Sequence, residues 1–179
     1  MKKLLMIIPL VILFCFTFSC QDKEAMAELE AMKAQAEVEE QNKEITRKFF
    51  KELDSGNFDA VIELHDSNFV LHMAGSPEPI KLEDANQLMR NFYTGISKQK
   101  HVIDLIIGEG DKVAIMTTTH GSHNGEFMGI PPSGVGVEFS QVIIWRITDG
   151  KIAEAWEVVD MLGLMQQLGM ELKPNEAEK

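Results

Sequence analysis

Apolar residues recur at helical spacing in the first half of this chain. One apolar helical face comprises Ile45, Phe49, Phe50 and Leu53, and the turn-forming residues 54–57 follow it directly. A strand-like alternation lies between two further helical patterns. The predicted elements are helices over residues 42–53, 58–65 and 82–97 and a strand over residues 68–73.

The second half of the chain changes to a strand pattern. Its apolar and β-branched residues alternate, and Asp149-Gly150 is the strongest hairpin signal in the sequence. Helices first and an antiparallel meander afterwards predict an α+β domain. The predicted strands cover residues 101–108, 113–123, 137–147 and 152–159, and a closing helix covers residues 161–168.

The N-terminus has the pattern of an export signal. Lys2 and Lys3 precede the apolar run Leu4–Phe18, which has signal-peptide length and is short for a membrane span. Ser19 and Cys20 follow it, an arrangement that resembles the lipobox of bacterial lipoproteins. The resemblance implies lipidation of Cys20 after cleavage in front of it. An ordinary secretory signal cut near Ser19 and an uncleaved anchor are the alternatives.

Residues 21–40 are rich in strong helix formers and contain neither Gly nor Pro. We interpret this stretch as a solvated helical tether, with a short coiled-coil dimerisation segment as the alternative. The expected organisation is a signal over residues 1–19, a tether over 20–41, a globular domain over 42–170 and a disordered tail over 171–179.

Composition narrows the function classes. The chain has 17 Lys+Arg against 28 Asp+Glu, a net charge of −11, which argues against nucleic acid and against a polybasic membrane patch. We therefore expect a membrane contact only through the lipid. Both cysteines, Cys15 and Cys20, lie at the N-terminus, so the domain has no thiol for a disulfide, a nucleophile or a metal.

Most common active-site motifs are absent. The Gly-rich connection over residues 124–136 lacks a Gly-Lys-Ser/Thr ending, and Pro131 and Pro132 remove amide donors that a phosphate loop needs. No Gly-x-Ser-x-Gly elbow occurs. His120 and His123 lie three apart on a strand and face opposite sides, so they share a metal only if the strand breaks at Gly121, and we expect no metal site.

The last predicted strand carries the most suggestive group of residues. Counted by twos, one face comprises Ile152, Glu154, Trp156, Val158 and Asp160. A carboxylate beside Trp156 in a concave apolar site would have a raised pKa and could act as an acid or base. The alternative is that this end of the face is solvent-exposed and that both carboxylates are simply hydrated.

Three segments together resemble the SnoaL-like polyketide cyclases, also called ester cyclases. Residues 121–134 read GSHNGEFMGIPPSG, residues 146–156 read RITDGKIAEAW, and Asp160 precedes LMQQLG at residues 164–169. The resemblance extends over residues 42–169. It implies an NTF2-like cone, in which N-terminal helices pack on a curved antiparallel sheet around an apolar pocket, with no cofactor.

The resemblance also implies roles for single residues. Asp160 matches the acid/base aspartate of an intramolecular aldol cyclisation, and His123 would assist it in catalysis. His72 matches a polar pocket position and Trp156 an apolar wall. We also expect Glu154 and Phe92 to contact the substrate.

Two functions follow as alternatives. The first is a cyclase-type enzyme that uses cofactor-independent acid–base chemistry on an apolar small molecule. The second is a non-catalytic envelope lipoprotein that binds such a molecule. Dimerisation through the sheet or the tether, giving a homodimer, is a third expectation. The expected location is the cell envelope, at the periplasmic face or the outer surface.

Overall fold

The computed structural model describes residues 2–173, and describes side chains from residue 23 onward. The chain divides into two units, Met1–Val38 and Glu39–Lys179. Helix α1 (Lys2–Asp54) supplies all described residues of the first unit and enters the second. The apolar side chains Met26, Leu29 and Met32 of the first unit are exposed. Within the part of the chain whose side chains are described, no helix is long and apolar enough to cross a membrane.

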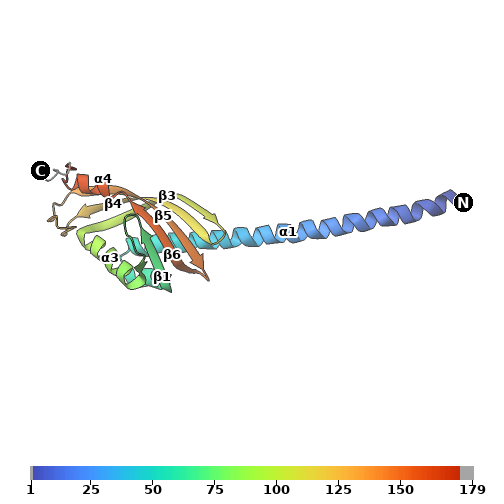
Figure 1. Cartoon of the computed structure of the whole chain (residues 1–179), viewed down its shortest axis with the longest axis horizontal. Helices are drawn as coiled ribbons and strands as arrows, with labels where there is room; N and C mark the ends of the chain where they lie inside the picture. Colours follow the sequence, from blue (N-terminus) through green and yellow to red (C-terminus); the bar gives the residue numbers. More distant parts are fainter. Residues whose placement is uncertain (1, 174–179) are drawn as a thin grey trace. The chain divides into compact units, whose positions relative to one another are not determined.

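The second unit is an α+β fold, as the sequence predicted, with helices packed on an open curved sheet (Figure 1). Six strands follow the order β2-β1-β6-β5-β4-β3. Neighbouring strands are antiparallel except β1 and β6, which are parallel, and the long stretch of chain between them allows this pairing. The elements after α1 are α2 (Phe58–Glu63), β1 (His65–Met73), β2 (Ile80–Lys81), α3 (Leu82–Gly95), β3 (Ile96–Glu109), β4 (Lys112–His123), β5 (Gly136–Thr148), β6 (Lys151–Val159) and α4 (Met161–Gln167).

Local sequence accounts for the element boundaries. Asn57 caps α2 by accepting a hydrogen bond from the Ala60 amide. Asp149 and Gly150 both have positive φ, at 51° and 74°, as a two-residue hairpin turn of the predicted kind requires. The two-residue strand β2 was not predicted, because two residues carry no readable alternation.

One face of the sheet is covered, and its core has two parts. A first apolar cluster joins the end of α1 to the middle of the sheet, with Phe49, Phe50 and Trp145 at its centre. A second apolar cluster lies between α3, α4 and the sheet, with Phe127, Phe139 and Leu164 buried in it. We call the side of the sheet that carries both clusters the covered face and the opposite side the outer face.

Candidate functional site

A β-bulge in β6 decides which residues reach the covered face. Ile147 pairs with Ile152, but the next pair is Arg146 with Glu154, so Ala153 is an extra residue. Ile152 is fully buried, whereas Val158 is 57% exposed. The prediction that Ile152, Glu154, Trp156 and Val158 share one face is therefore wrong. Beyond the bulge, the alternation carries Glu154, Trp156 and Val158 to the outer face.

Glu154 belongs to a paired polar group on the outer face. Its Oε1 lies 2.8 Å from Nε2 of His72, and its Oε2 accepts hydrogen bonds from Arg146 at 2.9 Å. The His72 ring stacks on Trp156, with centroids 5.4 Å apart. The hydrogen bond from His72 lowers the pKa of Glu154 most, and the hydrogen bond and charge of Arg146 lower it further. The pKa of the carboxylate beside Trp156 is thus lowered, whereas the first of the two sequence interpretations had it raised.

Glu157, three residues further along β6, has the properties expected of an acid or base. It lies on the covered face between Ala155 and Val159, and it pairs with Ile143. Burial raises the pKa of Glu157 to about 7. Among the described residues, no hydrogen bond or ion pair reaches its carboxyl group. Near neutral pH this group exists in both protonation states, which proton transfer requires.

Other polar side chains extend across the covered face from Glu157. We call Thr117, Thr119, Gln141 and Glu157 the polar band, since they lie on three neighbouring strands. Thr117 pairs with Gln141, and Thr119 follows two residues later on β4. The band separates Ile115 and Ile143 of the first cluster from Phe139 of the second.

The threonines of the polar band lack partners. Both are fully buried, and in the described part of the chain neither hydroxyl has a hydrogen-bond partner. Buried polar atoms are nearly always paired in folded proteins, so two unpaired hydroxyls on one face of β4 make the polar band a candidate ligand contact. Such threonines are easily missed in a sequence, because β-branched residues are also ordinary strand formers.

His123 ends β4 on the same face. It is fully buried, and its Nδ1 lies 3.0 Å from Oγ of Ser133. Its Nε2 has no partner among the described residues. His120 is 52% exposed beside Glu138, so the two histidines face opposite sides, as predicted. The second apolar cluster also holds Phe92, whose ring lies 4.9 Å from that of Phe127.

Asp160 lies outside the polar band. It is exposed and caps α4, because its Oδ1 accepts a hydrogen bond from the Gly163 amide at 2.9 Å. A Cβ at Gly163 would lie 2.3 Å from Oδ2 of Asp160, so the cap also requires glycine there. Asp160 therefore has a structural role as the N-cap of α4. Its predicted catalytic role stays a prediction.

Two further features lie apart from the polar band. A cleft of about 610 Å³ opens between β1 and the start of α3, and its lining includes Ser67, Asn68 and Asp84 but no residue of the band. Among the described residues, no three His, Cys, Asp or Glu side chains are grouped to hold a metal ion. The side chain of Cys20 lies outside the part described.

Comparison with known proteins agrees with this geometry. The sequence model of SnoaL-like polyketide cyclases matches residues 44–168. No curated protein matches the chain. The solved structure of AclR, a proposed hydroxylase from Streptomyces galilaeus, is similar at 25% identity and a TM-score of 0.69, covering 73% of this chain and 97% of AclR.

Two other solved structures resemble the chain. IdmH, a proposed polyketide cyclase from Streptomyces antibioticus, has 25% identity and a TM-score of 0.66, with 72% of this chain and 99% of IdmH covered. A SnoaL-like protein from Jannaschia sp. CCS1 has 24% identity and a TM-score of 0.67, with 75% and 96% covered. The predicted NTF2-like fold is thereby confirmed.

Proposed function

This chain belongs to the SnoaL-like polyketide cyclase family, and we propose that it transfers a proton to and from an apolar small molecule bound over the polar band. Glu157 is the acid and base in this proposal. The observation that supports it is an unpaired carboxyl group on a covered apolar face, with its pKa raised to about 7. A base with a pKa near the working pH is the most effective proton-transfer group.

The proposed reaction is an intramolecular aldol closure or a related step. The Glu157 carboxylate removes a proton from a carbon next to a carbonyl group, and the electron pair of that C–H bond forms an enolate. The enolate carbon attacks a second carbonyl carbon of the same molecule. Glu157 returns the proton to the new alkoxide oxygen, so a C–C bond and a hydroxyl group form.

The neighbouring polar groups suit the charge that develops. Thr117 carries a buried hydroxyl without a protein partner, and a donor placed in advance at an enolate oxygen lowers the barrier without reorganisation. Gln141, opposite Thr117, adds an amide at the same level of the sheet. The apolar clusters on both sides exclude water from the reacting carbon and hold the substrate in a folded shape.

The test uses proton exchange, which needs no knowledge of the natural substrate. β-Tetralone is a bicyclic, largely apolar ketone with exchangeable protons beside its carbonyl group. We expect the purified protein to accelerate their exchange in D₂O, followed by proton NMR. Glu157→Gln should lower the acceleration about 100-fold or more, since general-base catalysis contributes on that order.

Glu154→Gln is the matched control, because it removes a carboxylate three residues away on the outer face. Its exchange rate should equal that of the unmodified protein. Equal exchange by the unmodified protein and Glu157→Gln would remove Glu157 from the mechanism. Binding of β-tetralone without any acceleration would instead favour the non-catalytic alternative, a ligand-binding protein.

We also propose that the chain is anchored in the cell envelope by lipid on Cys20. The support is the sequence in front of this cysteine, in which two lysines are followed by an apolar run and then by the small residue Ser19. Metabolic labelling with an alkyne fatty acid should modify the full chain and not the Cys20→Ser variant. Equal labelling of both would exclude this anchor.

A further inference from the structure

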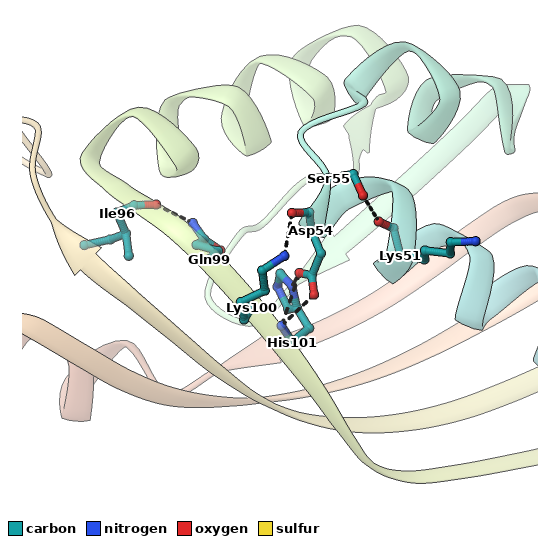
Figure 2. A network of polar contacts seen from close by, with 7 residues as sticks. All are labelled: Lys51, Asp54, Ser55, Ile96, Gln99, Lys100 and His101. Atoms are coloured by element: carbon teal, nitrogen blue, oxygen red, sulfur yellow. Dashed lines mark hydrogen bonds and ion pairs between the residues drawn. The ribbon is translucent and has the colours of Figure 1, made fainter.

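His101 is a buried histidine in which, among the described residues, only one of the two ring nitrogens has a hydrogen-bond partner. It lies on β3, and its side chain is 3% exposed. Its Nδ1 is 2.7 Å from Oδ1 of Asp54, the last residue of α1, and its backbone amide donates to the same carboxylate at 3.2 and 3.3 Å. Figure 2 shows this carboxylate directed at the His101 ring, with Lys100 donating to the Asp54 carbonyl oxygen.

This contact fixes the state of the imidazole ring. A carboxylate accepts only, so Nδ1 must carry the proton that it donates to Asp54. Burial lowers the pKa of His101, against the opposing effect of Asp54, so the ring is neutral near pH 7. Nε2 therefore presents a lone pair, and among the described residues no donor reaches it.

Two hydroxyl groups without partners lie around the same ring. Thr119 stands directly opposite His101 in the β3–β4 pairing, where facing side chains are about 5 Å apart. Tyr93 of α3 has its ring 6.5 Å from the His101 ring, nearly parallel to it. Within the described structure, neither hydroxyl has a hydrogen-bond partner. Burial, and then the charge of Asp54, raise the pKa of Tyr93.

A purely structural role explains only part of this arrangement. Asp54 joins the end of α1 to β3 through the His101 backbone and ring, and that junction is complete without further groups. It leaves the Nε2 lone pair of His101 and the hydroxyls of Thr119 and Tyr93 unused among the described residues. Buried hydroxyls without partners are rare in folded proteins, so two of them beside this ring call for a ligand that pairs with them.

We propose that Nε2 of His101, the Thr119 hydroxyl and the Tyr93 hydroxyl form a subsite for a hydroxyl group on an aromatic or enolic ring. The ligand hydroxyl donates to Nε2, and its oxygen accepts from the two protein hydroxyls. Asp54 is the positioning residue, because it holds the ring with Nε2 free. All three partners of the ligand hydroxyl are then defined: one acceptor and two donors.

This subsite lies at one end of the polar band, since Thr119 belongs to both. It rests on the proposed function only in requiring a small molecule over the covered face. With Glu157 at the other end of the band, a ligand would need its acidic carbon and its hydroxyl on different parts of its ring system. The subsite therefore selects hydroxylated polycyclic ligands over simple apolar ones.

The test compares β-naphthol with naphthalene, which has the same ring system without the hydroxyl group. Titration calorimetry gives the affinity of each, and nitrogen-15 NMR of labelled histidine reports the tautomer and hydrogen bonding of His101. We expect tighter binding of β-naphthol than of naphthalene. We also expect a change in the Nε2 resonance of His101 on addition of β-naphthol and none on addition of naphthalene.

Three variants separate ligand binding from folding. Tyr93→Phe and Thr119→Val delete unpaired hydroxyls, so both should fold at least as stably and each should bind β-naphthol about three- to tenfold more weakly. His101→Asn keeps a donor near the Nδ1 position and removes Nε2, and it should bind β-naphthol no better than naphthalene. His120→Asn, on the outer face, is the matched control and should bind as the unmodified protein does.

Two results would overturn the subsite. One is no binding of β-naphthol, or binding that leaves the His101 Nε2 resonance unchanged. The other is unchanged β-naphthol affinity in both hydroxyl deletions. Failure of the proposed function is seen separately, because β-tetralone exchange would then be the same in Glu157→Gln and the unmodified protein while His101 still responds to β-naphthol.

Discussion

Two glutamates of one strand show how much a local backbone irregularity decides. Glu154 and Glu157 are three residues apart on β6, and both lie near aromatic and apolar side chains. Glu154 faces outward, where His72 and Arg146 bind its carboxylate and lower its pKa. Glu157 faces the covered side without a partner, and burial raises its pKa. The same residue type thus has a lowered pKa in one place and a raised pKa in the other.

After the effect on catalysis, the largest expected effect concerns stability. Glu157 and Glu154 should make the free energy of unfolding depend on pH in opposite directions. The pKa of Glu157 rises from 4.5 in the unfolded chain to about 7, so folding favours its protonated form. Its contribution is present below about pH 4.5 and is lost as the pH rises through about 7. Each pKa unit corresponds to about 1.4 kcal/mol, and partial exposure reduces the total to about 2 kcal/mol.

Urea unfolding at about pH 5 and about pH 8 measures this difference. As the pH rises between these two values, the free energy of unfolding of Glu157→Gln should gain about 2 kcal/mol relative to that of the unmodified protein. Glu154→Gln should behave differently, because the lowered pKa of Glu154 stabilises the fold above about pH 4.5 and that contribution disappears as the pH falls. Parallel pH curves for both variants would show that the two environments do not differ as described.

Asp160 is a third carboxylate to compare with Glu154 and Glu157, and it caps helix α4. Asp160→Ala should lower the free energy of unfolding by about 1 kcal/mol, the usual cost of an N-cap. Asp160→Asn keeps the acceptor oxygen for the Gly163 amide and should cost little. If the role of Asp160 is structural, both variants exchange β-tetralone protons normally. Loss of exchange in Asp160→Asn would return Asp160 to the catalytic site.

The smallest expected effect concerns the unpaired hydroxyl of Thr117. Thr117→Val keeps the volume and shape of the side chain and removes a buried polar atom without a partner. The variant should unfold at equal or higher urea concentration, with a gain of about 0.5 kcal/mol. A clear loss of stability would mean that the hydroxyl is satisfied in the folded protein, and the polar band would then be structural at this position.

Sequence reasoning reached most of the fold but only part of the site. The strand and helix patterns are long in this chain, and the residue types at Asp149-Gly150 indicate a two-residue hairpin turn. These elements were therefore predicted within a few residues. Glu157 was missed because the count by twos began at Ile152, before the bulge at Ala153. Counted from Ala155, the same strand shows one carboxylate between two apolar residues, and that was the available signal.

His101 and Tyr93 carried no signal that sequence reasoning could use. His101 is far from Asp54 along the chain and meets it because β3 runs past the end of α1 (Figure 2), and Tyr93 comes to the His101 ring from α3. Their importance lies in which of their atoms remain unpaired. That property depends on every neighbouring side chain and cannot be read from spacing.

The sequence alone determined the order of the longer helices and strands, the α+β class and the family, because these follow from periodicity, turn residues and motifs that act over a few neighbouring positions. The tertiary structure decided which carboxylate can exchange a proton. One extra residue in β6 assigns Glu154 and Glu157 to opposite faces, and burial then separates their pKa values. Protonation depends on the surrounding dielectric and charges, which only the folded chain defines.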